Sequence, residues 1–323
     1  FSMANKCFNY VVDLGPGNAF YYEARAEKVR NLEAQLSWEG KLNGNELLAL
    51  ADAYRSLLKD LGGAPQSLPL QIRYAKLQAF YLNQAEKAKE TLDSLVQNGR
   101  GSAQDLAQAK LNLADVQLLL GDLWEPSLLY GQIEKAYPNL LEAQEAKFRN
   151  ARLAYFRGEF PWALTQVKVL KASTTKLIAN DALRLSLLIQ DNGGADSSFE
   201  ALEIFAQAEM AVYRKETKRA QALLDSLKQQ FPTHGLVAHS YWLRYEIAKE
   251  KQAYEQALSA LETLLSFDKN HLLADDALLA AGKLLENQLN QPEKAMEKYR
   301  GIILDYPASI WTNEARKRYR LLR

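Results

Sequence analysis

The chain has 323 residues, of which 40 are Lys or Arg and 39 are Asp or Glu, so its formal net charge at neutral pH is +1. This near balance does not favour nucleic acid as a partner, because nucleic-acid binding requires a basic stripe on one face. Cys7 is the only cysteine, which excludes a disulfide within the chain and a zinc ribbon.

Hydrophobic periodicity predicts helices along the whole chain, and no strand pattern competes with them. In chain order the predicted helices are 3–13, 19–37, 44–60, 66–82, 84–97, 102–120, 124–136, 140–157, 160–172, 176–190, 198–214, 217–230, 236–250, 253–266, 272–288, 292–304 and 309–322. The first helix has the pattern of the second helix of a pair. We therefore expect the chain to be a fragment that begins inside a longer array.

One sequence motif recurs in these helices: a turn, an aromatic or apolar residue, a small residue three positions later, and apolar residues four and seven positions after that. The small residue lets the second helix of a pair approach the first, and the later residues share its face. A unit of this kind cannot bury its own apolar face, so the predicted fold is an all-α solenoid of helix pairs. The small residues are Ala88, Ser127, Ala163, Ala220, Ala257 and Ala295, at intervals of 39, 36, 57, 37 and 38 residues.

The motif resembles that of the tetratricopeptide repeat (TPR) family, whose period is about 34 residues. The resemblance implies a right-handed superhelix of antiparallel helix pairs that spans 1–323 as a single solenoid. The segments that carry it are Gly121-Asp122-Leu123-Trp124-Glu125-Pro126-Ser127, Gly158-Glu159-Phe160-Pro161-Trp162-Ala163, and the helix ends Ala136-Tyr137-Pro138-Asn139, Gln230-Phe231-Pro232 and Asp305-Tyr306-Pro307.

The 57-residue interval is the one clear break in the period. It exceeds its neighbours by about twenty residues, which is enough for one extra helix and a loop. Residues 191–198 have the composition of a loop, with Gly193 and Gly194 at their centre. We expect them to form an exposed loop insertion, with helix 176–190 as the odd member of the pairing. A hinge or a lid is the functional alternative.

In the TPR family the first helices of the pairs line the concave surface, and the resemblance places several polar side chains there. Arg149 and Arg152 share a helical face with Tyr155, and forked arginine donors suit a carboxylate or a peptide backbone. A solvated face, with long side chains covering apolar surface, is the alternative. The candidate partner-binding residues are Arg73, Lys76, Asn112, Asp115, Arg149, Arg152, Tyr155, Trp242 and Glu246, with Gln108, Glu145 and His239 on the same helix faces.

The C-terminal stretch has a second resemblance. Asp305-Tyr306-Pro307-Ala308-Ser309 followed by Glu314-Ala315-Arg316-Lys317-Arg318-Tyr319 resembles a motif of Gram-negative envelope TPR proteins, including outer-membrane assembly lipoproteins. This implies the periplasmic face of the outer membrane, reached through an N-terminal anchor that the sequence does not include, with a cytoplasmic location as the alternative. Ser309 can cap the last helix. No apolar run approaches the roughly 18 residues that span a bilayer.

No catalytic or cofactor motif emerges, and His234, His239 and His271 are too scattered to predict a metal site. The sequence therefore predicts a non-enzymatic scaffold without a cofactor that binds a peptide segment or a partner protein in its concave groove, with an envelope assembly role as one form of it. The alternative is an outer-membrane glycan- or nutrient-binding protein that stacks sugars on aromatic residues. The five tryptophans are spread along the array at similar helix positions, which favours packing instead.

Overall fold

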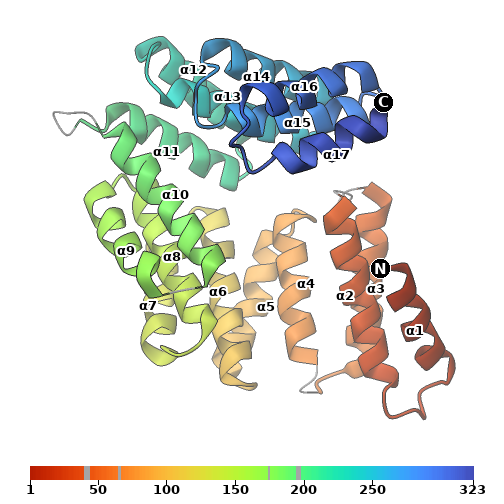
Figure 1. Ribbon diagram of the computed structural model, residues 1–323. Coiled ribbons are helices and arrows are strands. Elements are labelled where there is room, and N and C mark those ends of the chain that lie inside the picture. Colours follow the sequence, from red (N-terminus) through yellow and green to blue (C-terminus); the bar gives the residue numbers. More distant parts are fainter. Residues whose placement is uncertain (40–43, 65–66, 174, 194–197) are drawn as a thin grey trace. The chain divides into compact units, whose positions relative to one another are not determined.

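The computed structural model describes residues 1–39, 44–64, 67–173, 175–193 and 198–323, and within them the chain is all-helical with no strand (Figure 1). Every predicted helix is present, and the ends differ from those predicted by at most three residues. The helices are α1 (Ser2–Asp13), α2 (Tyr21–Glu39), α3 (Gly44–Leu61), α4 (Leu68–Phe80), α5 (Ala85–Asn98), α6 (Ala103–Leu120), α7 (Glu125–Ala136), α8 (Leu141–Phe156), α9 (Phe160–Ser173), α10 (Lys176–Asn192), α11 (Glu200–Tyr213), α12 (Thr217–Gln230), α13 (Leu236–Glu250), α14 (Tyr254–Phe267), α15 (Ala274–Asn287), α16 (Pro292–Asp305) and α17 (Thr312–Leu322).

The helices divide into two compact units. Unit 1 contains Phe1–Leu153 and Thr165–Ala182, and unit 2 contains Ala154–Leu164 and Leu183–Arg323. The division passes through α8, α9 and α10, so each of these helices contributes to both units. The single continuous solenoid over 1–323 and its right-handed course stay predictions.

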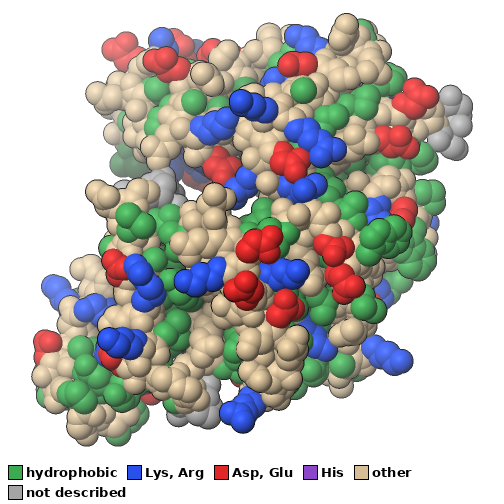
Figure 2. Space-filling model, turned by 180° about the vertical axis from the view of Figure 1, so that it is seen from behind, with side chains coloured by type: hydrophobic (Ala, Val, Ile, Leu, Met, Phe, Trp, Pro, Cys, Tyr) green, Lys and Arg blue, Asp and Glu red, His purple; other side chains and the backbone are tan. Residues whose placement is uncertain are grey.

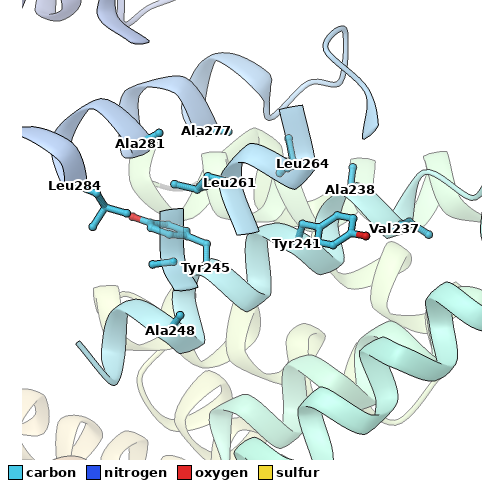
Figure 3. Packing of buried hydrophobic residues seen from close by; sticks show 11 residues of the cluster. Val237, Ala238, Tyr241, Tyr245, Ala248, Leu261, Leu264, Ala277, Ala281 and Leu284 are labelled. Atoms are coloured by element: carbon cyan, nitrogen blue, oxygen red, sulfur yellow. The ribbon is translucent and has the colours of Figure 1, made fainter. Parts of the chain in front are cut away.

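Successive helices pack as pairs, which confirms the all-α repeat of helix pairs. In unit 1 α4 packs on α5 and α6 on α7, and in unit 2 α11 packs on α12, α13 on α14 and α15 on α16. The second helix of each pair also contacts the first helix of the next one, as α14 contacts α15. Figure 3 shows the result in unit 2, where the fully buried Leu261 and Leu264 of α14 lie in one cluster with Tyr245 and Ala238 of α13 and with Ala281 and Ala277 of α15.

The turn inside each pair contains one residue in the left-handed backbone conformation. These residues are Asn83, Gly121, Gly158, Lys215, Gln252 and Asn290, with φ between 50° and 105°. The N–H of the following residue returns to a carbonyl near the end of the first helix; Glu216 N, for example, donates to Ala211 O at 2.8 Å. Such a turn closes a helix and reverses the chain.

The same turns correct one position of the sequence register. In five pairs the small residue lies five positions after the left-handed residue, as Ala257 follows Gln252. The equivalent position after Gly121 is Pro126, which is buried, whereas Ser127 is only partly buried. The anchor is therefore Pro126, which lies 38 residues after Ala88 and 37 before Ala163. A proline fits there because the first turn of a helix needs no amide donor from it.

The predicted loop 191–198 differs from the structure at its start. Asp191 and Asn192 form the last turn of α10, and the Asn192 side chain donates to Leu188 O at 2.8 Å. Residues 194–197 lie outside the described residues, so the rest of the loop stays a prediction, as does the odd place of α10 in the pairing.

Candidate functional site

Three of the predicted groove residues, Arg73, Asp115 and Arg149, belong to networks that link neighbouring helices. In each network a buried tyrosine and an arginine bind the same carboxylate. Tyr130 donates to Asp115 at 2.8 Å, and Arg149 binds the other oxygen of that carboxylate at 2.5 Å. One network therefore ties α6, α7 and α8 together.

The other two networks have the same plan. Tyr54 donates to Glu33 at 2.6 Å and Arg73 donates to the same oxygen at 3.1 Å, which connects α2, α3 and α4. In unit 2 the equivalent residues link α15, α16 and α17: Tyr299 donates to Glu286 at 2.6 Å and Arg318 to the same oxygen at 2.9 Å. In all three networks the arginine follows the tyrosine by nineteen residues.

The hydroxyls of Tyr54 and Tyr299 are held in their neutral, donating form. Burial, followed by the interaction with Glu33, raises the pKa of Tyr54, and burial together with Glu286 raises that of Tyr299. Gly282 makes room for the second ring, because a Cβ there would lie 2.5 Å from a carbon of the Tyr299 ring. A buried hydroxyl paired with a charged acceptor stabilises the contact between repeats.

The remaining predicted residues of α6 and α8 divide into buried and exposed ones. Asn112 is 3% exposed and donates to Gln108 O at 2.7 Å, and Tyr155 is 1% exposed and donates to Glu209 at 2.6 Å. These two side chains lie in the core rather than on an open wall, which differs from the expectation. Arg152 is exposed on α8, and Lys76 is exposed on α4.

Trp242 is also explained largely by packing. It is partly buried against the core of α13 and α14, with its ring 5.2 Å from that of Tyr245, and its Nε1 donates to Glu246 at 3.2 Å. The structure thus brings Trp242 and Glu246 together on one face of α13, as their spacing predicts.

The three histidines lie in unit 2, where they accept hydrogen bonds from loop backbone groups or pack on one another. The Nδ1 atoms of His234 and His271 accept the N–H groups of Leu236 and Leu273 at 3.1 and 3.2 Å, just before α13 and α15. His239 packs edge-to-face on His271 with ring centroids 4.8 Å apart. Burial, with His271 as the next cause, lowers the pKa of His239 to about 4. Among the described residues, no group of three or more His, Cys, Asp and Glu side chains is placed to hold a metal ion.

Ser309 occupies the same place before α17. Its Oγ accepts the N–H of Trp311 at 3.0 Å, and Thr312 is the first residue of the helix. Ser309 therefore stabilises the turn that leads into α17, rather than capping the helix directly as predicted.

A groove of about 470 Å³ lies over α13 between α12 and α14, and the sequence did not predict it. Its floor contains the buried side chains of Tyr241, Ile247 and Ala248. Its rim is polar and mostly exposed, with Gln221 from α12 and Gln256, Ser259 and Thr263 from α14 among the lining residues. The periodic pattern gives no signal for it, because its residues come from helix faces that carry no recurring motif.

Charges at this groove are partly paired. Arg244 binds Asp225 of α12 at 2.7 Å, and Lys228 lies over the Tyr241 ring, 5.6 Å from its centroid. On the face of the molecule seen in Figure 2, acidic and basic side chains are interspersed. Arg244, Lys251 and Glu255 line the groove itself, so it offers an apolar floor, hydrogen-bonding groups and charges of both signs to a ligand.

Two tryptophans are more exposed than the packing interpretation predicts. Trp124 is 71% exposed in unit 1, and Trp162 is 57% exposed in unit 2. Trp311 instead donates from Nε1 to Asp276 at 2.7 Å and is partly buried. The side chain of Trp38 lies outside the described residues.

The sequence matches no protein-family model and no curated protein. Among solved structures, the chain is similar to the crystal structure of a tetratricopeptide repeat protein from Parabacteroides merdae ATCC 43184, with 13% sequence identity and a TM-score of 0.37. The match covers 93% of this chain and 98% of that one. At this degree of similarity, the fold assignment rests on the helix pairs and turns described above. No helix in the described ranges is long and apolar enough to cross a membrane.

Proposed function

We propose that this protein is a non-enzymatic scaffold that binds a segment of a partner protein in the groove over α13. The observation that carries the proposal is the composition of this groove, with an apolar floor of Tyr241, Ile247 and Ala248 beneath a polar rim. Burial of apolar side chains of a bound segment on such a floor lowers the free energy of the complex, and hydrogen bonds to polar groups at the edge fix the register of the segment.

The rim suits an extended backbone. Gln221 and Gln256 each carry an amide donor and an amide acceptor, and Ser259 adds a hydroxyl on the α14 side. Unpaired N–H and C=O groups of a peptide between α12 and α14 can therefore find partners on both sides, while its side chains reach the floor. Buried area alone does not set affinity, because a few contacts, often with aromatic residues, carry most of the binding energy. We therefore expect the contact with Tyr241 to contribute most to the affinity for the segment.

Filling the groove tests the proposal. Ser259→Tyr places a large ring at the exposed rim of α14, and Ala222→Tyr adds the same ring 37 residues earlier, at an exposed position of α12 that does not line the groove. We expect the full chain and the Ala222→Tyr variant to retain the same partner from an extract of the source organism, and Ser259→Tyr to lose it. Titration of that purified partner then gives the affinities. Equal binding by all three proteins would exclude the groove.

The envelope resemblance of 305–319 makes cell-envelope extracts the first place to search for the partner. Attachment to an outer membrane and an assembly role there are part of this proposal. A partner recovered only from soluble cytoplasmic extracts would count against them.

Glycan binding is the second candidate, and the exposure of Trp162 favours it. Sugars stack on exposed aromatic rings, and this ring is 57% exposed at the start of α9. Binding of the full chain to a glycan array, lost in Trp162→Ala and kept in Ser259→Tyr, would replace the protein segment with a carbohydrate as the ligand.

A further inference from the structure

A second cavity, of about 330 Å³, lies within unit 1 among α7, α8 and α9. Ala143 and Leu170, which are buried, and Pro138, just after α7, give it an apolar wall. Pockets for small molecules have volumes of about 300–1,000 Å³. The volume of this cavity lies at the lower end of that range and therefore suits a small ligand.

This cavity has the same place in the repeat as the groove over α13. The anchor residues of α7 and α9 lie 94 positions before those of α12 and α14. In this register Lys147 and Val169, which line the cavity, correspond to Tyr241 and Thr263, which line the groove. A hollow over a first helix, between two second helices, thus occurs in both units with different side chains.

Two glutamines at this cavity carry buried polar atoms without a hydrogen-bond partner. Gln144 lines the cavity, and its buried Oε1 accepts no hydrogen bond. Gln166 lies one turn before Val169 and Leu170 on α9, and so shares their face. Its equivalent in α14, Ala260, lines the groove over α13.

The side chain of Gln166 is 8% exposed, and its buried Nε2 donates to no acceptor in the described part of the chain. Buried polar atoms without partners are rare, and each lowers the stability of the fold. A ligand that accepts a hydrogen bond from Gln166 and donates one to Gln144 would remove both penalties.

Two side chains of opposite charge complete the cavity. Glu134 of α7 and Lys147 of α8 both line it and are partly buried. Burial raises the pKa of the Glu134 carboxyl, while Lys147 and a hydrogen bond with Asn150 act in the opposite direction. Neither Glu134 nor Lys147 forms an ion pair within the described ranges. A ligand cation at Glu134 and a ligand anion at Lys147 would stabilise both charges.

We propose that this cavity binds a free α-amino acid with an apolar side chain. The carboxylate of the amino acid accepts hydrogen bonds from Lys147 and Gln166. Its ammonium group donates to Glu134 and Gln144, and its side chain packs on the apolar wall. One ligand of this class supplies a partner to each of the four polar groups. The site is separate from the groove over α13 and does not depend on the function proposed for that groove.

An internal peptide segment fits these groups less well. A backbone amide can pair with the two glutamines, because it has one donor and one acceptor. It carries no charge for Glu134 and Lys147, however, and would remove water from both side chains without pairing them, which costs free energy. The observations therefore favour a small ligand that carries both charges.

The test is calorimetric titration of the full chain with L-leucine, L-valine and L-phenylalanine. N-acetyl-L-leucine, which lacks the ammonium charge, and L-leucinamide, which lacks the carboxylate, are titrated in parallel. We expect L-leucine to bind the parent protein and each modified compound to bind about tenfold or more weakly, because each loses a charged contact.

Two variants locate the site. Gln166→Leu removes the unpartnered amide, and Lys147→Met removes the cation; both should weaken the binding of L-leucine by about tenfold or more. The matched control is Lys135→Met, which removes an exposed lysine of α7 that does not line the cavity. Gln166→Leu should unfold at the same temperature as the parent or higher, since it replaces a buried polar group that has no partner. A loss of binding in this variant is therefore not a folding defect.

Several outcomes would overturn the proposal: no binding of any of the three amino acids at millimolar concentration, equal binding of the modified compounds, or equal affinity in the parent and Gln166→Leu. Binding of N-acetyl-L-leucine amide in place of the free amino acids would assign the cavity to a peptide segment. Ser259→Tyr, which fills the groove over α13, should leave the binding of L-leucine unchanged. The two sites can therefore fail independently.

Discussion

Removing the hydroxyl of Tyr299 tests whether the networks of tyrosine, acid and arginine stabilise the repeats. The ring is fully buried, and its hydroxyl donates to Glu286 at 2.6 Å while Arg318 binds the same oxygen. Tyr299→Phe keeps the ring and deletes only the donor. A hydrogen bond to a charged group contributes about 1.5–3 kcal/mol, so we expect the free energy of unfolding to fall by about that amount.

The assay is thermal and urea unfolding of the full chain, followed by circular dichroism. In a unit of about 150 residues, the size of unit 2, 1 kcal/mol corresponds to about 2–4 °C. The midpoint of the transition that includes α15 to α17 should therefore fall by about 3–12 °C. Tyr10→Phe is the control, because Tyr10 is 70% exposed and its hydroxyl has no comparable buried acceptor. A surface change of this kind stays within about 0.5 kcal/mol.

A double-mutant cycle with Glu286→Gln separates the shared interaction from the two single losses. Residues in one network couple by about 0.5–3 kcal/mol. If Tyr299→Phe unfolds like the parent, or if the two changes add without coupling, the network does not stabilise unit 2. The same reasoning applies to Tyr54→Phe and Tyr130→Phe in unit 1.

Three further changes test the turns, the histidine contact and the register. Gln252→Gly should raise the free energy of unfolding, measured in urea, by about 1 kcal/mol, because φ is 57° at this position and a left-handed conformation strains any residue that carries a side chain. Gly158→Ala, at φ 77°, should lower it by a similar amount. The folded pKa of His239 lies at about 4, below its ordinary value of 6.5, so the unfolded state binds the proton more readily and stability should fall as the pH drops from about 6.5 towards 4. His239→Phe should flatten that pH dependence of the unfolding free energy, and an unchanged slope would assign it to other groups. Ala163→Trp should destabilise by about 1–3 kcal/mol or more, since Ala163 is fully buried, and a midpoint as high as that of Lys168→Trp on the exposed face of α9 would contradict the register.

The helices could be predicted from the sequence because their periodicity and their ends are local properties. The spacing of small residues also predicted the pairs, since it reflects the close approach of two helices. Ser127 was misplaced by one position because two compact residues, Pro126 and Ser127, stand side by side, and only the left-handed turn at Gly121 distinguishes them.

The candidate site could not be predicted in the same way. A charged residue on a first helix has the same spacing whether it faces solvent or the next repeat, and Arg73 and Arg149 turned out to face a neighbouring carboxylate. One signal was present, namely a tyrosine nineteen residues before an arginine in three places, but its meaning depends on contacts between helices. The groove over α13 has no such signal, because its lining is gathered from three helices.

The network at Arg149 also changes how the predicted arginine wall must be tested. Its guanidinium binds Asp115, whose side chain is only 15% exposed, and Glu145 at 2.9 Å. Arg149→Ala therefore leaves the Asp115 carboxylate without its cation and should lower the unfolding free energy by about 1–3 kcal/mol. A loss of binding in a double variant of Arg149 and Arg152 would then have two explanations, a lost contact with the partner and a folding defect. Arg152→Gln alone reduces this ambiguity, because its side chain is exposed and the unfolding midpoint of the variant reports any contact that the side chain makes within the fold. A weaker titration of the purified partner by Arg152→Gln, at an unchanged midpoint, would support the wall on α8. An unchanged affinity would remove α8 from the binding surface and leave the groove over α13 as the site.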